Sequence, residues 1–494
     1  MPRTFFEKQS PSSLRKDIIA LNQLFKTKKF LEQQSIEDLI EYKELINSYI
    51  QDPYFSNLRP AIKQILRRII AQIDERMHLL NSVQDDIEEF DLSECYIQIP
   101  SPDEIAQMHH MPAGGKEDQQ ARIMHMTQAL KNYHSLPIMT NTQGSVPERW
   151  SQLFGEITKG NRPAAFHLLD QIPETDIILQ SLLAIHPRDY LKQLIDYSIQ
   201  ASKRGVKEIN SDIVITPETF RVLITDLATT LLNPSKIIFS FGLPTHHAFS
   251  NEGSGFCLIN KTAVLMKFWE TVHEEPVHYV IIGTDVNRDN GLCQILCQTA
   301  SHMNICHIDI FDSRVYPGQD HSYINQEFNS MGTEVGEKIK CWNHNNLEYY
   351  AVDLSLTSRK KIDLHPALQF ALTKLKEQIA QAKTHHHKVA LLLPTGWDSH
   401  EDETAPCGKW VNDRMMSQSE ASKTRFNDGD LTFFYEQIFE LYNENKEHIT
   451  GIYWGLEGGY DRAMYERQIN ILAQLIGTHL IQQNSQASSS RMSY

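Results

Sequence analysis

Short apolar runs rich in β-branched residues alternate with helical stretches between about residues 145 and 482. The runs are SKIIFSF, VHYVIIGTDV, NICHIDIF, EYYAVDLSL, KVALLLPTGW and HITGIYWGL. Several lack period-two alternation, which is typical of strands that helices cover on both faces. The segments between them, such as HPALQFALTKLKEQIAQA, have helical periodicity. The pattern predicts an α/β domain over residues 145–482, with a mostly parallel sheet flanked by helices.

The rest of the chain divides into three further segments. Residues 1–95 carry apolar residues at helical spacing, as in SIEDLIEYKELINSYI, and predict an all-α N-terminal module. Its charged face is typical of solvated surface, and the alternative is that its basic cluster KQILRRI contacts an acidic protein partner. Residues 96–144 contain Pro, Gly and charge, which is typical of a connector or flap. Residues 483–494 have few apolar side chains and predict a disordered polar tail.

The net charge and the cysteines limit the partners and the compartment. A net charge of −15 argues against direct nucleic-acid binding, because phosphate contacts need a basic face. No apolar run is long enough for a membrane helix, and the N-terminus lacks the apolar core of a signal peptide. The 7 cysteines show no metal-binding spacing and predict reduced thiols. We expect an intracellular protein, in cytoplasm or nucleus, with export through the polar tail as the alternative.

Polar side chains follow four of the predicted strands, where each strand ends. In open α/β sheets, functional residues gather beyond the carboxyl ends of parallel strands. Histidines, carboxylates, an amide and a tyrosine that converge on one rim would suit a hydrolytic metal site. These residues are His246 and His247, Asp285 and Asn287, Asp398, and Tyr460.

The segments around these residues resemble the zinc-dependent histone deacetylase family, which has an arginase-like fold. PTHHAFSNEGSGFCLINKTAVLMK is similar to the family's PGHHA…GFCxxNNxAIA segment, PTGWDSHEDE to SAGFDAHxxDP, and GLEGGYD to LEGGY. VPERW, IHPRDYLKQL and VYPG match further family segments in the family's order. The resemblance covers about 340 residues and leaves out roughly the first 130.

The resemblance implies a role for each matched residue. His247 matches the general base that activates a water molecule, and His246 matches its electrostatic or acid partner. Tyr460 matches the tyrosine that hydrogen-bonds the oxyanion. Asp285 and Asp398 match ligands of a single zinc ion. A narrow tunnel for the acyl-lysine stem is implied at Gly255, Phe256 and Tyr316.

The segment GTDVNRDNG departs from the family pattern D-x-D-x-H-H-G-D-G. Asn287 stands where the family has a zinc-binding histidine, and its neutral amide oxygen should bind zinc more weakly or favour a harder metal. Gly283 replaces the first aspartate, so we expect the carboxylate behind His246 to be missing. The same change argues against the potassium site of many family members. Asn290 replaces the later aspartate and makes the partner of His247 neutral.

Other ligand sets would use different residues of the same segments. Arginase-like enzymes with two metals use D-x-H-x-D, and this chain keeps both outer carboxylates, Asp285 and Asp289. The later strand offers Asp398 followed by His400 where such enzymes need two aspartates, which favours one ion. We do not expect His400 to bind metal, and we expect His302 and His307 to be buried in or near strands.

Three functions are compatible with this sequence. The first is hydrolysis of N-acetyl-lysine in proteins or peptides, for which the acidic charge suits a basic substrate such as a histone tail. The second is a catalytically impaired pseudo-deacetylase that reads acyl-lysine or acts as a scaffold. The third is an amidohydrolase for acetylated polyamines. Because both histidines, both aspartates and the tyrosine are kept, we favour the first.

Overall fold

The structure is a computed structural model of the whole chain, which divides into two compact units, Met1–Phe90 and Asp91–Tyr494. In the first unit it describes eight residues: 42, 43, 45, 46, 66, 69, 70 and 73. In the second it describes residues 94–481 except 108–118, 134–135, 142–145, 211, 274, 300–302, 337, 356–364, 405–409, 412–413 and 416–423.

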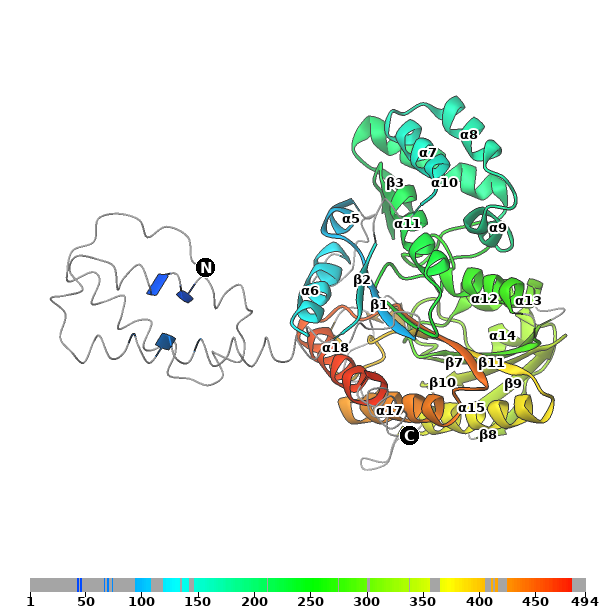
Figure 1. Cartoon of the computed structure of the whole chain (residues 1–494). Helices are drawn as coiled ribbons and strands as arrows, with labels where there is room; N and C mark the ends of the chain where they lie inside the picture. The colour runs from blue at the N-terminus through cyan, green and yellow to red at the C-terminus, as the bar shows by residue number, and fades with distance from the viewer. Residues whose placement is uncertain are drawn as a thin grey trace, which may run out of the picture. The chain divides into compact units, whose positions relative to one another are not determined.

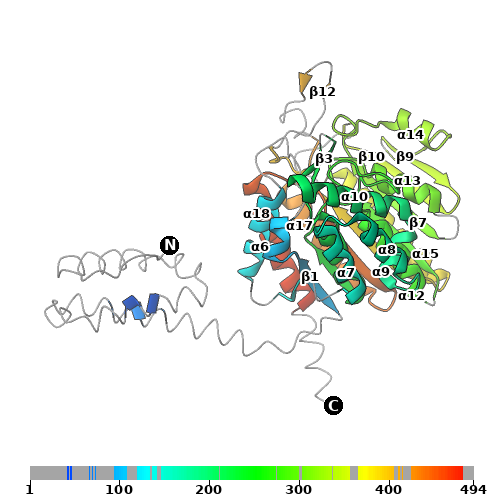
Figure 2. The same cartoon turned by 90° about the horizontal axis from the view of Figure 1, so that it is seen from above.

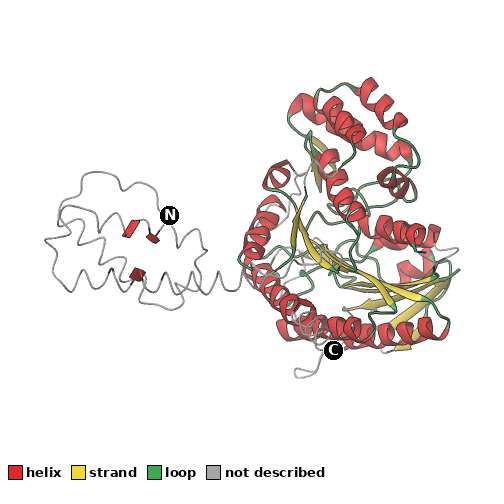
Figure 3. Ribbon diagram, viewed as in Figure 1, coloured by secondary structure: helices red, strands yellow, loops and turns green. Residues whose placement is uncertain are grey.

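A 10-stranded sheet forms the centre of the second unit, in the order β2-β1-β5-β14-β11-β6-β7-β10-β9-β8 (Figures 1 and 3). Every pair from β2 to β10 in this order is parallel, and β9 and β8 add an antiparallel edge. The strands of this sheet are β1 (Cys95–Ile99), β2 (Ile138–Thr140), β5 (Ile237–Ser240), β6 (Val277–Gly283), β7 (Asn304–Phe311), β8 (Thr333–Gly336), β9 (Ile339–His344), β10 (Leu347–Asp353), β11 (Lys388–Thr395) and β14 (Ile449–Leu456). Two small hairpins lie outside it, β3 (Lys207–Asn210) with β4 (Ile213–Ile215), and β12 (Trp410–Val411) with β13 (Arg414–Met415).

Helices cover both faces of the sheet. In Figure 1, α11, α12 and α13 lie on one face, and α6, α18, α17 and α15 lie on the other. Figure 2 looks down onto α7, α8 and α10, which pack together beyond α11. The helices are α5 (Pro102–Gln107), α6 (Gln119–Lys131), α7 (Glu148–Thr158), α8 (Arg162–Gln171), α9 (Ile177–Leu183), α10 (Arg188–Arg204), α11 (Thr219–Leu232), α12 (Lys261–Val272), α13 (Asn290–Thr299), α14 (His321–Glu327), α15 (Pro366–Thr384), α17 (Asp428–Glu444), α18 (Arg462–Ile476) and a π-helical turn at Gly477–Ile481.

The burial of the central strands explains their sequences. Every residue of β6 is buried, and so are all but the first of β11. A strand with helices on both sides has no solvent-facing positions, so its sequence loses the alternation of apolar and polar residues. The predicted α/β class, with a mostly parallel sheet flanked by helices, is confirmed.

The segment 96–144 is not a connector, contrary to the sequence-based expectation. It contributes β1 and β2, which form one edge of the main sheet, as well as α5 and α6. The sequence CYIQIP is short and ends in Pro, so its apolar character is outweighed by the Pro, Gly and charge that follow. The α/β unit therefore begins about 50 residues before position 145.

The predicted N-terminal module and polar tail lie almost wholly outside the described residues. The eight described residues of Met1–Phe90 are helical, and Ile46, Leu66, Ile69 and Ile73 among them are buried. An all-α module there stays a prediction, as does the tail at 483–494. In the described part of the chain, no helix combines the length and apolarity that crossing a membrane requires.

Candidate active site

Four neighbouring parallel strands bring the predicted residues to one rim of the sheet. In the order β5, β14, β11 and β6, the strands end just before the polar segments that the sequence singled out. Because carboxyl ends of parallel strands share an edge, segments more than 200 residues apart in sequence meet there. The site is therefore a direct product of the sheet order.

A cavity of about 160 Å³ lies at this rim. Every residue predicted from the sequence lines it except Asn290, and Asp212, Pro244, Glu403 and Gly458 join them. The predicted residues in its wall are His246, His247, Gly255, Phe256, Asp285, Asn287, Tyr316, Asp398 and Tyr460.

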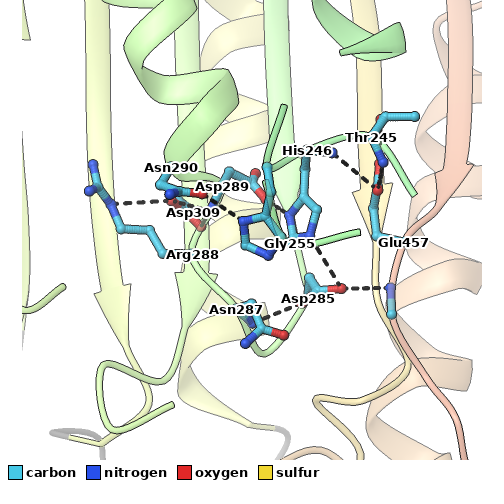
Figure 4. Close-up of polar contacts among 12 residues, drawn as sticks. Thr245, His246, Gly255, Asp285, Asn287, Arg288, Asp289, Asn290, Asp309 and Glu457 are labelled. Carbon is cyan, nitrogen blue, oxygen red and sulfur yellow. Dashed lines mark hydrogen bonds and ion pairs between the residues drawn. The ribbon is translucent and has the colours of Figure 1, made fainter. Parts of the chain in front are cut away.

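Both histidines of the tandem pair are buried and held by hydrogen bonds. His246 Nδ1 lies 2.7 Å from Asp289 Oδ1 (Figure 4). His247 Nδ1 lies 2.6 Å from Asn290 Oδ1. The expectation that His246 lacks a carboxylate partner is therefore wrong, because Asp289 supplies one from the loop after β6. The neutral partner expected for His247 is present in Asn290.

The surroundings give the two imidazoles opposite charge states. Burial lowers the pKa of His246, but the carboxylates of Asp285, Glu457 and Asp289 outweigh burial and raise it to about 10. Burial, together with the charge of His246, lowers the pKa of His247 well below its usual value. These opposite shifts favour a charged His246 and a neutral His247, and a neutral imidazole can accept a proton.

Asp285 and Asp398 place two buried carboxylates side by side. Asp285 accepts the backbone N–H of Gly458 at 2.7 Å, and Asp398 accepts that of Val286 at 3.1 Å. Burial raises the pKa of both, and the charge of Asp285 helps to raise that of Asp398 to about 7. A Cβ at Gly458 would touch both carboxylates, so only glycine fits there. A cation between them would relieve the cost of two buried negative charges.

Asn287 is arranged to offer oxygen to such a cation. Its side-chain N–H donates to the Tyr316 carbonyl at 2.8 Å, and its backbone N–H donates to Asp285 at 2.8 Å. The amide oxygen is then the ligand atom left for the cavity that Asn287 lines. With Asp285 and Asp398, it forms a set of three oxygen donors, which fits one divalent ion and favours harder ions more than an imidazole would.

The residues near Gly283 do not fit the potassium ion of many family members, a site that the glycine at position 283 already argued against. Asp289, His307 and Asp309 are close enough together to hold a metal. However, His307 Nε2 lies 3.0 Å from Asp289, and the Tyr349 hydroxyl donates to Asp309 at 2.7 Å. Arg288 adds a buried positive charge 4.0 Å from Asp309. Protein donors thus already partner these carboxylates.

The phenol of Tyr460 is fixed by residues from two other segments. The Arg122 guanidinium, from α6, stacks over its ring and donates to the carbonyl oxygens of Glu457 at 2.6 Å and Gly458 at 3.3 Å. The Glu403 carboxylate accepts the backbone N–H of Tyr460 at 2.6 Å. Burial raises the pKa of Tyr460 well above its usual value, so the hydroxyl keeps its proton and can donate it in a hydrogen bond.

The predicted tunnel residues surround the cavity. Tyr316 contacts His247 edge to face, with 5.0 Å between ring centroids, and its hydroxyl lies 2.6 Å from Ser254 Oγ. Phe256 contacts Tyr460, with centroids 6.2 Å apart. At Gly255, whose φ is +49°, a Cβ would collide with the His247 ring. Glycine there lets the chain pass close to the histidine.

The alternative ligands do not reach the cavity. His400 lies 3.1 Å from Asp428 and accepts the backbone N–H of Asp402, and His307 is buried against Asp289. Asp289 is bonded to His246 and His307, so it cannot serve as the outer ligand of a second metal. His302 lies outside the described residues.

Besides Pro244 and Gly458, four further residues of the site were not predicted. Asp212 lines the cavity from the turn between β3 and β4, and Glu457 accepts hydrogen bonds from Thr245 and from the His246 backbone. Glu457 and Glu403 each lie within a few residues of a predicted site residue, which could have drawn attention to them. Arg122 and Asp212 lie in segments without a recognisable local signal.

Comparison with known proteins identifies the family of this chain. Residues 145–476, about two thirds of the chain, match the family model described as histone deacetylase domain. The chain belongs to the histone deacetylase family. No curated protein matches it. Among solved structures, a crystal structure of the HDA15 HD domain is similar at 14% identity, with a TM-score of 0.48, and the alignment covers 78% of this chain and 91% of that one.

Proposed function

We propose that this chain is a metal-dependent deacylase that hydrolyses N-acetyl-lysine in proteins or peptides. The observation that carries the proposal is the meeting, around one cavity, of two buried histidines, the oxygen-bearing side chains of Asp285, Asn287 and Asp398, and the Tyr460 phenol. Asp285, Asn287 and Asp398 would hold the ion, which is zinc in the family. When bound, such an ion polarises the acyl carbonyl and acidifies water.

One side chain transfers the protons, and two others stabilise the negative charge that develops on the substrate. His247, being neutral, takes a proton from the attacking water and later passes a proton to the leaving lysine amine. The Tyr460 hydroxyl donates to the oxyanion that forms when water adds to the carbonyl. The positive charge of His246 stabilises the same negative charge. The acyl–nitrogen bond then breaks, which yields acetate and a free amine.

The aromatic lining of the cavity and the acidic charge of the chain support a basic, linear substrate. The aromatic rings of Phe256 and Tyr316 stand at the cavity and suit an unbranched apolar stem such as that of acetyl-lysine. A net charge of −15 favours encounter with basic peptides such as histone tails. An intracellular location would give access to such substrates.

One observation favours a second function, that of an acyl-lysine reader without turnover. Asn287 provides a neutral oxygen where an imidazole would bind zinc more strongly. If the ion is not retained, the cavity could still bind acyl-lysine. Acetylated polyamines would fit the same cavity and are a third substrate class to assay.

The deciding experiment combines metal content with turnover on the full chain. The purified protein, loaded with zinc or with manganese, is assayed on acetyl-lysine peptides and on acetylspermidine. The proposal predicts about one bound ion per chain and release of acetate from the peptides. Metal-free, inactive protein that binds acetyl-lysine peptide would establish the reader instead, and turnover of acetylspermidine alone would establish the polyamine hydrolase.

A further inference from the structure

Strand β6 ends in a glycine, Gly283, and the side chain of Asp289 occupies the space beside it. Gly283 is the last residue of the strand, and its backbone adjoins the Asp289 carboxylate so closely that a Cβ at Gly283 would collide with Asp289 Oδ2. The side chain of Asp289 therefore occupies the space into which any larger residue at 283 would project. Gly283 is required here by this close approach.

Both oxygens of the Asp289 carboxylate have assigned partners. Oδ1 lies 2.7 Å from His246 Nδ1, and Oδ2 lies 3.0 Å from His307 Nε2. The backbone N–H of Asp289 donates to Asp309 at 3.2 Å, which fixes the loop from the neighbouring strand β7. An ionised carboxylate only accepts, so both histidine nitrogens must donate.

This arrangement determines which nitrogen of His246 faces the reaction. With Nδ1–H held by Asp289, Nε2 points to the other side, 3.9 Å from Asp285 (Figure 4). A carboxylate that accepts a hydrogen bond from one nitrogen of a histidine ring fixes the direction in which the other nitrogen points.

We infer that Asp289 is the positioning residue of His246, and that Gly283 and Asp289 form a matched pair in which the loop supplies the carboxylate that the strand end lacks. The inference rests on the proposed function, because it states how His246 is oriented for that reaction. It also explains why the segment GTDVNRDNG keeps a carboxylate at His246 although position 283 is glycine.

A carboxylate swap tests the pair. We expect Asp289→Asn and Asp289→Gly each to lower kcat about 10- to 100-fold with little change in KM. Gly283→Asp alone should also lower kcat, because the two carboxylates then collide. The double variant Gly283→Asp with Asp289→Gly should recover to within about threefold of wild type, since it moves the carboxylate to the strand end.

The control is Asp312→Asn, which removes another buried carboxylate near the end of β7 that is bonded to Arg314 and not to a histidine. Its kcat should stay within about twofold of wild type. If the double variant is folded, binds metal as wild type does and remains as impaired as Asp289→Gly, the inference is overturned.

A measurement without turnover separates this inference from the proposed function. In ¹⁵N-histidine-labelled protein, we expect a strongly downfield N–H proton from His246, assigned by its loss in His246→Gln. It should vanish in Asp289→Gly and return in the double variant. If the wild type is inactive but shows this pattern of signals, the proposed hydrolase function is refuted and the pairing of Gly283 with Asp289 is supported. If the wild type is active but its His246 signal does not change in Asp289→Gly, only the pairing is refuted.

Discussion

The guanidinium carbon of Arg122 lies 4.9 Å from the centre of the Tyr460 ring, although the two residues are separated by most of the chain. Arg122 is fully buried and its Nη2 group also holds two carbonyl oxygens of the loop that carries Tyr460. A single side chain from α6 thus fixes both the ring and the backbone of the residue proposed to stabilise the oxyanion.

This contact predicts that Arg122→Lys lowers kcat about 10- to 100-fold. Lysine keeps the charge but cannot stack as a plane or donate in a fixed fork, so the Tyr460 hydroxyl loses its position. Steady-state kinetics on an acetyl-lysine peptide would measure the loss. The control is Arg162→Lys, an exposed arginine that stacks over Phe166, does not line the cavity and should have wild-type kinetics. Equal kinetics for both variants would contradict the positioning role.

Removing the Tyr460 hydroxyl should separate catalysis from metal binding. We expect Tyr460→Phe to lower kcat about 10²- to 10³-fold, because one hydrogen bond to the oxyanion is lost. Metal content, measured by elemental analysis, should stay at the wild-type level, since Tyr460 contributes no atom to the proposed ligand set. If Tyr460→Phe loses the metal along with its activity, the proposal that Tyr460 acts only on the oxyanion is contradicted.

Replacing Asn287 probes the metal set directly. Asn287→His should raise zinc affinity at least about 10-fold over wild type, because imidazole is a better zinc ligand than an amide oxygen. Competition with a zinc-binding dye gives the affinity, and Asn287→Ala serves as the control that loses the ligand without replacing it. An unchanged affinity in the histidine variant would mean that residue 287 does not face the ion.

Glu104 gives a prediction that is independent of catalysis. Burial and, to a smaller extent, the nearby charge of Asp226 raise its pKa to about 7, against the partial opposing effects of Arg221 and of hydrogen bonds from Ser101 and Asn141. The folded state therefore favours the protonated form of Glu104, whereas the unfolded chain ionises it at a lower pH. As the pH rises from about 4.5 to about 7, the free energy of unfolding falls, because ionisation becomes favourable in the unfolded chain first.

The variant Glu104→Gln should accordingly match wild type near pH 4.5 and be more stable by about 2–3 kcal/mol at pH 8. Unfolding by urea at the two pH values measures the difference. The exposed neighbour Asp103 provides the control, since Asp103→Asn should change stability little at either pH. A Gln variant that gains nothing at pH 8 would show that Glu104 is well solvated.

The sequence was a good guide to the sheet centre and a poor one to its edges. Strands such as β6 and β11 are long, apolar and buried on both faces, so local pattern and tertiary environment agree. β2 has only 3 residues and owes its conformation to pairing with β1, which no local pattern reveals.

The same division holds for the site. Residues at strand ends could be placed together from the sheet topology alone. The partner of His246 could not be predicted, because Asp289 is not at a strand end and reaches its place only through the fold of the loop around Gly283. Arg122 was missed because its contact depends on α6 packing beside α18.

The position of β1 between β2 and β5 has a practical consequence for anyone who expresses part of this protein. A fragment cut at residue 145, where the family match begins, would lack β1 and β2 and leave the edge of β5 that faces β1 unpaired. Unpaired strand edges recruit other chains, so such a fragment should aggregate. The fragment would also lack Arg122, so even soluble fragment should be inactive in an assay in which the full chain is active.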